Sequence, residues 1–241
     1  MSKPDTIGPL LAFGAHPDDI EFACGGVIAS ATRAGQRAHF VVCSHGEAGT
    51  SGTPDQRENE AKRGAQALGA TIDFVQLDGD AHLDVRAAHA VKLAAIFRRQ
   101  RPAVVLAPSL VDNQHPDHAN LGRLVLNASR LARYGGIQEL KDLPRHVTSQ
   151  LLYYAVSPDS EPRDITPIYI DISAPEVVAQ WQAAMEAHAS QTQARNYVEM
   201  QLTRARLNGM RCGVQHAVAL FPSNPIVVPS LALITGGGNR F

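Results

Sequence analysis

The chain has 241 residues, of which 44% are hydrophobic, and a formal net charge of −1 at pH 7. This length is enough to bury one sizeable core, so we expect a single domain over residues 1–241. Aromatic residues make up only 5% of the chain and the basic residues are scattered, which argues against nucleic acid as a partner.

Strands and helices are predicted to alternate through the first half. Four short apolar segments have the composition of strands: residues 9–14, 38–43, 71–77 and 103–107. Helical spacing lies between them, in residues 20–34, 56–68 and 85–100. Gly35, Gly69 and Pro102 follow these helices as stop signals. The pattern predicts an α/β fold, a Rossmann-like, doubly wound and mostly parallel sheet with helices on both faces.

The second half gives weaker signals. Strands are predicted at residues 151–156, 168–172 and 214–221, and helices at residues 175–189 and 194–207. Residues 48–55, rich in Gly, Ser and Thr, predict a mobile loop after the second strand that could act as a lid.

Two polar motifs follow predicted strands. Gly14 to Asp19 (GAHPDD) comes directly after the first strand, where a dinucleotide-binding protein would carry GxGxxG, so a nicotinamide cofactor is not expected. Asp112 to His118 (DNQHPDH) follows the fourth strand. In the commonest doubly wound order these two strands are neighbours. The motifs are therefore predicted to face one crevice, at the carboxyl ends of strands one and four.

These residue types predict a catalytic metal site. Two imidazoles and one carboxylate form an open zinc site with room for water, and the metal would lower the pKa of that water and polarise a carbonyl group. A spare carboxylate can serve as general base and a spare imidazole can stabilise an oxyanion. Taken singly, a His after a strand or an Asp before Ile20 is more often a turn or capping residue. Five ionisable residues at two adjacent strand ends favour a site, although spacing alone does not show whether Asp18 or Asp19 is the ligand.

Cysteine content and hydropathy indicate the cellular compartment. Three widely spaced cysteines without a CxxC pair argue against a disulfide framework or a thiolate zinc site. Met1 to Gly8 is polar, and no apolar run is long enough to span a bilayer. We therefore expect a cytoplasmic protein that does not contact membranes.

With these motifs the chain resembles the LmbE-like, or PIG-L, family of zinc-dependent sugar N-deacetylases. The resemblance runs from Leu11 to about Phe221 and is carried by AHPDD at 15–19, GEAGT at 46–50, Arg57, HPDH at 115–118 and AHASQ at 187–191. It implies that His16, Asp19 and His118 bind Zn²⁺, that Asp18 is the general base, that His115 stabilises the tetrahedral intermediate and that Asp117 orients His115. In layout the chain is most similar to the bacillithiol-pathway enzymes that deacetylate N-acetylglucosaminyl malate.

The resemblance also implies a substrate and partners. Arg57 matches a substrate-contacting Arg of those enzymes, and Glu47 is the other candidate for substrate binding. The expected reaction removes an acetyl group from an N-acetylglucosamine-type conjugate by means of metal-bound water and an Asp base. Relatives are often oligomeric, so a homo-oligomer is expected.

Two departures and several alternatives stay open. Asp78 to Leu83 lacks the Arg of a Pro-Asp-Arg-Gly stretch in those enzymes, and His216 stands where the family often has Tyr. These changes leave the aglycone and sugar undetermined. The alternatives are cleavage of a larger amide such as a thiol conjugate, ferrous-iron chemistry on the same ligands, and a non-catalytic carbohydrate-binding or metal-storage role. In the deacetylase itself, Fe²⁺ could replace Zn²⁺.

Overall fold

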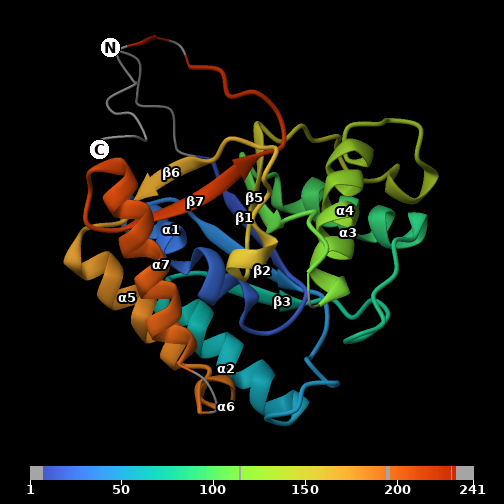
Figure 1. Ribbon diagram of the computed structural model, residues 1–241. Coiled ribbons are helices and arrows are strands. Elements are labelled where there is room, and N and C mark those ends of the chain that lie inside the picture. The colour runs from blue at the N-terminus through green and yellow to red at the C-terminus, as the bar shows by residue number, and fades with distance from the viewer. Residues whose placement is uncertain (1–7, 114, 194–195, 229, 232–241) are drawn as a thin grey trace.

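The computed structural model describes residues 8–113, 115–193, 196–228 and 230–231 (Figure 1). Its strands are β1 (Leu10–Gly14), β2 (Ala38–Val42), β3 (Thr71–Phe74), β4 (Val104–Pro108), β5 (Gln150–Tyr154), β6 (Ile168–Asp171) and β7 (Ala217–Pro222). Its α-helices are α1 (Asp19–Arg33), α2 (Pro54–Ala67), α3 (Ala87–Gln100), α4 (Pro116–Leu131), α5 (Pro175–Glu186), α6 (Ala189–Thr192) and α7 (Tyr197–Cys212). Two short 3₁₀ turns are η1 (Gln138–Leu140) and η2 (Pro158–Ser160).

The strands form one sheet in the order β3-β2-β1-β4-β5-β7-β6. β1 pairs in parallel with both β2 and β4, and β5 continues the parallel set beside β4. β7 is antiparallel to β5 and β6. The predicted α/β, mostly parallel sheet is confirmed, and with it the adjacency of the first and fourth strands.

Both faces of the sheet are covered by helices. Along β1, Leu10 and Ala12 face one core with residues of α1, α2, α5 and α7, and Leu11 and Phe13 face the other with residues of α3 and α4. This alternation is the two-residue period of a strand, and burial on both faces explains why the strand is a continuous apolar run. Figure 1 shows α3 and α4 on one side of the sheet and α1, α5 and α7 on the other.

Helix α5 anchors the second half of the chain against α1. Trp181 of α5 is fully buried, and its indole N–H donates to the carbonyl oxygen of Glu21 at 2.7 Å. Gly25 makes this approach possible, because a Cβ there would lie 2.6 Å from Trp181 Cδ1. The helix that follows the first motif is therefore fixed by a residue far along the sequence.

The structure differs from the predicted elements mainly in the second half. The helix predicted over residues 175–189 divides into α5 and α6. Of the helix predicted over 194–207, the first two residues lie outside the described residues, and α7 runs from Tyr197 to Cys212. Gly213, with φ 73°, ends α7 in the left-handed conformation typical of a C-terminal glycine. Helix α4 has no counterpart among the predicted helices. Across the described part of the chain, no helix combines the length and apolar character needed to cross a membrane.

Candidate active site

The turn between β1 and α1 positions the first motif. His16 and Asp19 are buried where β1 ends, and Asp18 is the N-terminal cap residue of α1. Asp18 has φ 122°, a backbone conformation that non-glycine residues rarely adopt. Such strain is concentrated at functional sites, where neighbouring structure holds the residue in place.

The start of α4 positions the second motif beside the first. His115 is the cap residue of α4 and Pro116 occupies its first turn, where a missing N–H costs nothing. Asp117 and His118 follow in that turn and are buried. Since β4 is the neighbour of β1, both motifs meet at the same edge of the sheet.

His16, Asp19 and His118 form one group of potential metal ligands. Their ligand atoms lie within 4.8 Å of one another. Asp19 Oδ1 is 3.1 Å from His118 Nε2, and Asp19 Oδ2 is 3.6 Å from His16 Nδ1. Burial opposes ionisation of Asp19, but His118 and His16 hold its pKa well below the ordinary value. Backbone N–H groups of Ala15 and His16 donate to Asp19 Oδ2 at 2.8 and 3.0 Å, which fixes the carboxylate.

The other ring nitrogen of His16 faces two more carboxylates. His16 Nε2 lies 3.1 Å from Asp80 Oδ1 and 3.4 Å from Asp117 Oδ2. Metal-binding histidines commonly direct their second nitrogen to a carboxylate, which fixes the ring and raises its basicity. Burial lowers the pKa of His16, but Asp117, Asp19 and Asp80 together raise it well above the ordinary value. With two imidazoles and a carboxylate converging on one side, the residues fit a zinc ion held by His16, Asp19 and His118.

Asp80 contacts His115 directly, and Asp117 belongs to the same group, since ligand atoms of His16, Asp80, His115 and Asp117 lie within 4.8 Å of one another. Asp80 Oδ1 lies 3.4 Å from His115 Nε2. Asp117 Oδ2 instead accepts from the N–H of Ala81 at 2.8 Å and faces His16. The loop after β3 reaches the site and places Asp80 between the two histidines. The orientation of His115 by Asp117 stays a prediction, and Asp80 is a second candidate for that role. His115, His16 and His118 lie ring against ring, with centroid distances of 4.3 to 5.3 Å.

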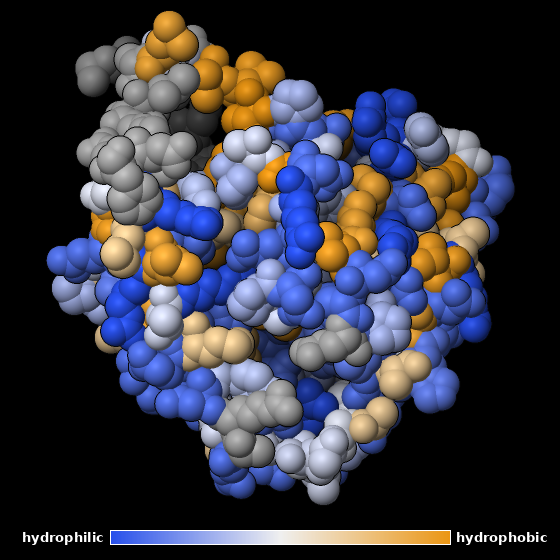
Figure 2. All heavy atoms as spheres, viewed as in Figure 1, coloured by the Kyte–Doolittle hydropathy of each residue, from blue (hydrophilic) through white to orange (hydrophobic). Residues whose placement is uncertain are grey.

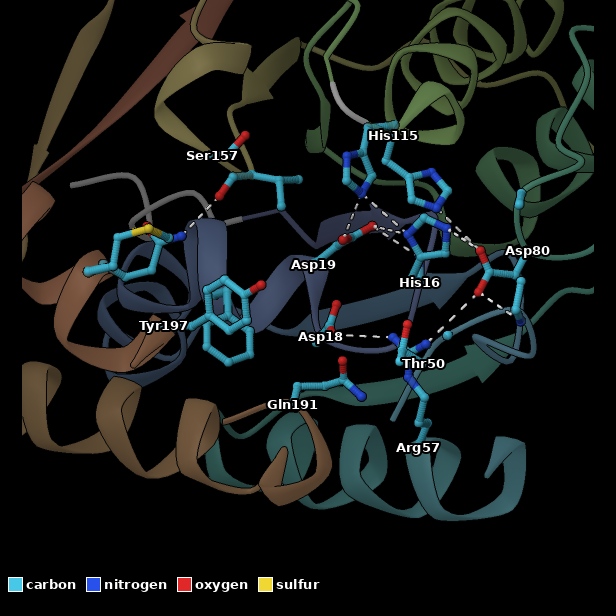
Figure 3. A pocket seen from close by; sticks show the side chains of 18 residues that line it. His16, Asp18, Asp19, Thr50, Arg57, Asp80, His115, Ser157, Gln191 and Tyr197 are labelled. Atoms are coloured by element: carbon cyan, nitrogen blue, oxygen red, sulfur yellow. Dashed lines mark hydrogen bonds and ion pairs between the residues drawn. The ribbon is translucent and has the colours of Figure 1, made fainter. Parts of the chain in front are cut away.

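Asp18 is the carboxylate of the first motif that lines the cavity without belonging to either group of potential metal ligands. Burial raises its pKa to about 6, with Asp19 adding to the rise and Arg57 opposing it. A base whose pKa is near the working pH is efficient at taking and returning a proton. Figure 3 shows Asp18 between the histidine group and Arg57, facing the same cavity.

Arg57, predicted to contact substrate, is enclosed by the protein. Its side chain is buried, its Nη1 donates to the carbonyl oxygen of Gly46 at 2.8 Å, and its Nη2 lies 3.3 Å from Asp18 Oδ2. Gly46 has φ 69°, and a Cβ there would lie 2.2 Å from Arg57 Nη1, so glycine is required at this close approach. Arg57 lines the cavity, and it also binds the carbonyl group of Gly46 in the loop and the carboxylate of Asp18.

Glu47, the other predicted substrate residue, supports the loop after β3. Its carboxylate accepts from the N–H of His45 at 2.9 Å, from Gln76 Nε2 at 2.8 Å and from the N–H of Asp80 at 3.1 Å. The described residues that line the cavity do not include Glu47. Glu47 thus holds the backbone of Asp80, and its contact with substrate stays a prediction.

A cavity of about 480 Å³ opens over these groups, within the usual range for small-molecule sites. Its lining contains His16, Asp18, Asp19, Phe22, Ala48, Gly49, Thr50, Arg57, Asp80, Ala81, His115, His118, Val156, Ser157, Gln191, Tyr197, Met200 and Gln201. In the space-filling view a hollow opens below the centre, surrounded by mainly hydrophilic side chains (Figure 2). The loop predicted as a lid contributes Ala48, Gly49 and Thr50.

Sequence reasoning missed the residues of the opposite wall and the importance of Asp80. Ser157, Gln191 and Tyr197 come from segments with weak signals, and only their meeting with β1 and β4 in space makes them part of the cavity. Asp80 lies in the divergent segment after β3, and an acidic residue in that segment was the available signal. The second divergent position, His216, lies just before β7 and does not line the cavity.

The fold and site define a Rossmann-like α/β protein with a two-histidine, one-aspartate metal-type centre. The model of the PIG-L family, described as GlcNAc-PI de-N-acetylase, matches residues 11–129. A conserved protein of Thermus thermophilus is similar over the whole fold, with a TM-score of 0.81 and 31% identity over 92% of this chain and 98% of that one. The chain belongs to the PIG-L, or LmbE-like, family of deacetylases.

Two curated relatives differ in what their names describe. The 4-oxalmesaconate hydratase of Pseudomonas putida is 31% identical over 138 residues, which are 52% of this chain and 53% of that protein. The match thus spans about half the length of that relative. The diacetylchitobiose deacetylase of Thermococcus kodakarensis is 27% identical over 200 residues, or 76% of this chain and 69% of that protein.

Proposed function

We propose that the protein is a zinc-dependent N-deacetylase that hydrolyses the acetamide of an N-acetylglucosamine-type sugar conjugate. The observation that carries this proposal is the convergence of His16, Asp19 and His118 on one side of a cavity whose other polar groups include a further carboxyl group, that of Asp18. A metal at this position would supply a Lewis acid that activates water and polarises the amide carbonyl. Family membership supports the same reaction class.

The other carboxylates and the third histidine have roles in the proposed hydrolysis. Asp18 accepts the proton of the attacking water and returns it to the amine that leaves as the C–N bond breaks. His115 donates a hydrogen bond to the oxyanion of the tetrahedral intermediate, and Asp80 holds the His115 ring at 3.4 Å. Asp117 holds His16 from the side away from Asp19 and His118. Acetate and a free amino sugar are the products.

The decisive experiment measures free amine and acetate released from a panel of N-acetylglucosamine conjugates, including the malate conjugate, by zinc-loaded protein. The matched variant is Asp18→Ala, which should keep the bound metal and lose about 10²- to 10⁴-fold in kcat, the usual contribution of a general base. Full activity in that variant, with metal bound, would show that Asp18 is not the base. Absence of amine from every conjugate would contradict sugar deacetylation.

A hydratase is the second candidate, because one of the curated relatives is by its name a hydratase. The same centre could deliver water to a carbon–carbon double bond instead of an amide. The two activities separate cleanly, since hydration releases neither amine nor acetate and consumes the ultraviolet absorbance of a conjugated acid. Release of a larger acyl group instead of acetate would identify the remaining alternative, an amidase for bulkier conjugates.

A further inference from the structure

The cavity has one ionised wall and one uncharged wall. His16, Arg57, Asp80 and His115 gather on one side in Figure 3, Ser157 and Tyr197 lie on the other, and Asp18 and Gln191 lie between them. Val156, Met200 and Gln201 complete the uncharged wall. Whatever part of a substrate extends away from the metal ligands therefore meets hydroxyl, amide, apolar and aromatic groups.

Within the described residues that line the cavity, Arg57 is the single permanent cation, and its charge is already engaged. Its side chain is only 6% exposed, and it lies 3.3 Å from Asp18 Oδ2 and 3.9 Å from Asp80 Oδ2. The carbonyl oxygens of Pro17 and Gly46 accept further hydrogen bonds from its Nη atoms at 3.2 and 2.8 Å. A substrate anion would have to compete with two carboxylates for this guanidinium.

The charges around the cavity leave no positive charge free for a substrate anion. Asp18, Asp19 and Asp80 supply three carboxylates and Asp117, 3.4 Å from His16 Nε2, a fourth, whereas Arg57 with a divalent metal would supply three positive charges. Asp80 is 4% exposed, and the loop holds it in place through the N–H of Ala48, which donates to Oδ2 at 3.1 Å. A carboxylate or phosphate that entered would be desolvated near this fixed negative charge without a free partner, which is costly.

The uncharged wall suits a sugar ring. Tyr197 packs edge to face on Phe22 with centroids 5.9 Å apart, which leaves an aromatic surface beside the cavity. Gln191 donates to the carbonyl oxygen of Ser51 at 2.9 Å, so its amide is held in a fixed orientation. Aromatic faces with nearby amides and hydroxyls bind neutral, hydroxyl-rich molecules through apolar contact and hydrogen bonds.

We propose that the pocket selects N-acetylated sugars whose remaining part is uncharged, such as neutral glycosides and N-acetylglucosamine oligosaccharides, and discriminates against conjugates with a carboxylate or phosphate. This inference rests on the proposed deacetylase function and names its substrate class. It also separates this protein from a hydratase, because 4-oxalmesaconate is by its name a polycarboxylic acid.

The test uses N-acetylglucosaminyl malate and its dimethyl ester, in which two methyl groups remove both negative charges, with amine release by zinc-loaded protein as the readout. We expect kcat/KM for the ester to exceed that for the free acid by about tenfold or more, because like charges brought together in a partly buried site are strongly disfavoured. Equal values, or a preference for the free acid, would overturn the inference while leaving deacetylation intact. No release from either, nor from neutral N-acetylglucosamine glycosides, would instead contradict the proposed function.

A variant of the uncharged wall makes the test specific to this pocket. Met200→Arg adds a cation on an unbranched stem in α7, and Met200→Gln is the matched neutral control. The preference for the ester should fall severalfold in Met200→Arg and stay unchanged in Met200→Gln. The same ratio in both variants would show that charge at this wall does not set the selection.

Arg195, which lies outside the described residues, provides a further control. In Arg195→Gln the ratio of kcat/KM for the ester to kcat/KM for the free acid should match that of the unmodified protein. A selective loss of activity on the free acid in that variant would reveal a second cation serving the pocket and would overturn the inference.

Discussion

The two halves of the chain contribute different things to one cavity. The segment from β1 to α4 supplies the histidines and carboxylates, which follow the carboxyl ends of parallel strands, and the guanidinium of Arg57, which lies in α2. The segment from β5 to β7 supplies the opposite wall, from η2 and the region of α6 and α7. Under the proposed function, the reactive groups come from the first half of the chain and the groups that select the substrate from the second half.

The largest effect is expected on the ionised side. His118→Ala removes one of the two imidazoles that face Asp19, and the loss of a metal that contributes several kcal/mol should reduce kcat/KM by about 10³-fold or more. Metal content after dialysis, measured beside amine release, checks the cause. His216→Ala is the matched control, since His216 does not line the cavity, and it should keep both metal and activity within about twofold. Normal metal content in His118→Ala would break the assignment of this ligand.

Much of this first half could be predicted from the sequence because its signals are local. A buried parallel strand is a continuous apolar run, and Gly35 and Gly69 mark helix ends directly in the sequence. The order rule then places the two motifs together without any knowledge of side chains, and β1 does pair with β4. Helix α4 was missed because the polar motif HPDH forms its first turn and hides its start.

The rest could not be predicted, because it depends on contacts between distant segments. His188 had no identifiable partner in sequence, yet it is fully buried with Nε2 3.3 Å from Glu21 Oε1 of α1. In the sequence Asp80 is only one residue of a polar turn. The three-dimensional path of that turn brings Asp80 to His16 and His115. Neither spacing nor propensity carries such long-range information.

A smaller effect is expected at Asp80, which contacts a histidine of each motif. Burial opposes its ionisation, but hydrogen bonds to His115 and His16 hold its pKa far below the ordinary value, so it remains a carboxylate. Asp80→Asn keeps the shape and removes the charge, and we expect kcat to fall about 10- to 100-fold, as is typical for groups that orient metal ligands.

Separate measurement of kcat and KM distinguishes a positioning role of Asp80 from a simple loss of folding. A positioning role lowers kcat with thermal stability and KM for a neutral substrate retained, whereas a structural role lowers the folded fraction. Gln76→Ala is a suitable control on the same loop, because Gln76 contacts Glu47 but does not line the cavity. Unchanged kcat in Asp80→Asn would assign the orientation of His115 to another group.

The smallest effect is expected on the uncharged side, at Tyr197. Tyr197→Ala removes the aromatic surface beside Phe22, and because such ring contacts contribute about 0.5–1.5 kcal/mol, KM should rise about 2- to 10-fold. kcat should stay nearly constant, since Tyr197 lies across the cavity from His115 (Figure 3). Tyr197→Phe is the matched variant: normal KM there would assign the effect to the ring, and a rise equal to that of Tyr197→Ala would assign it to the hydroxyl group. A fall in kcat in both variants would contradict the proposal that the first half of the chain supplies the reactive groups and the second half only substrate contacts.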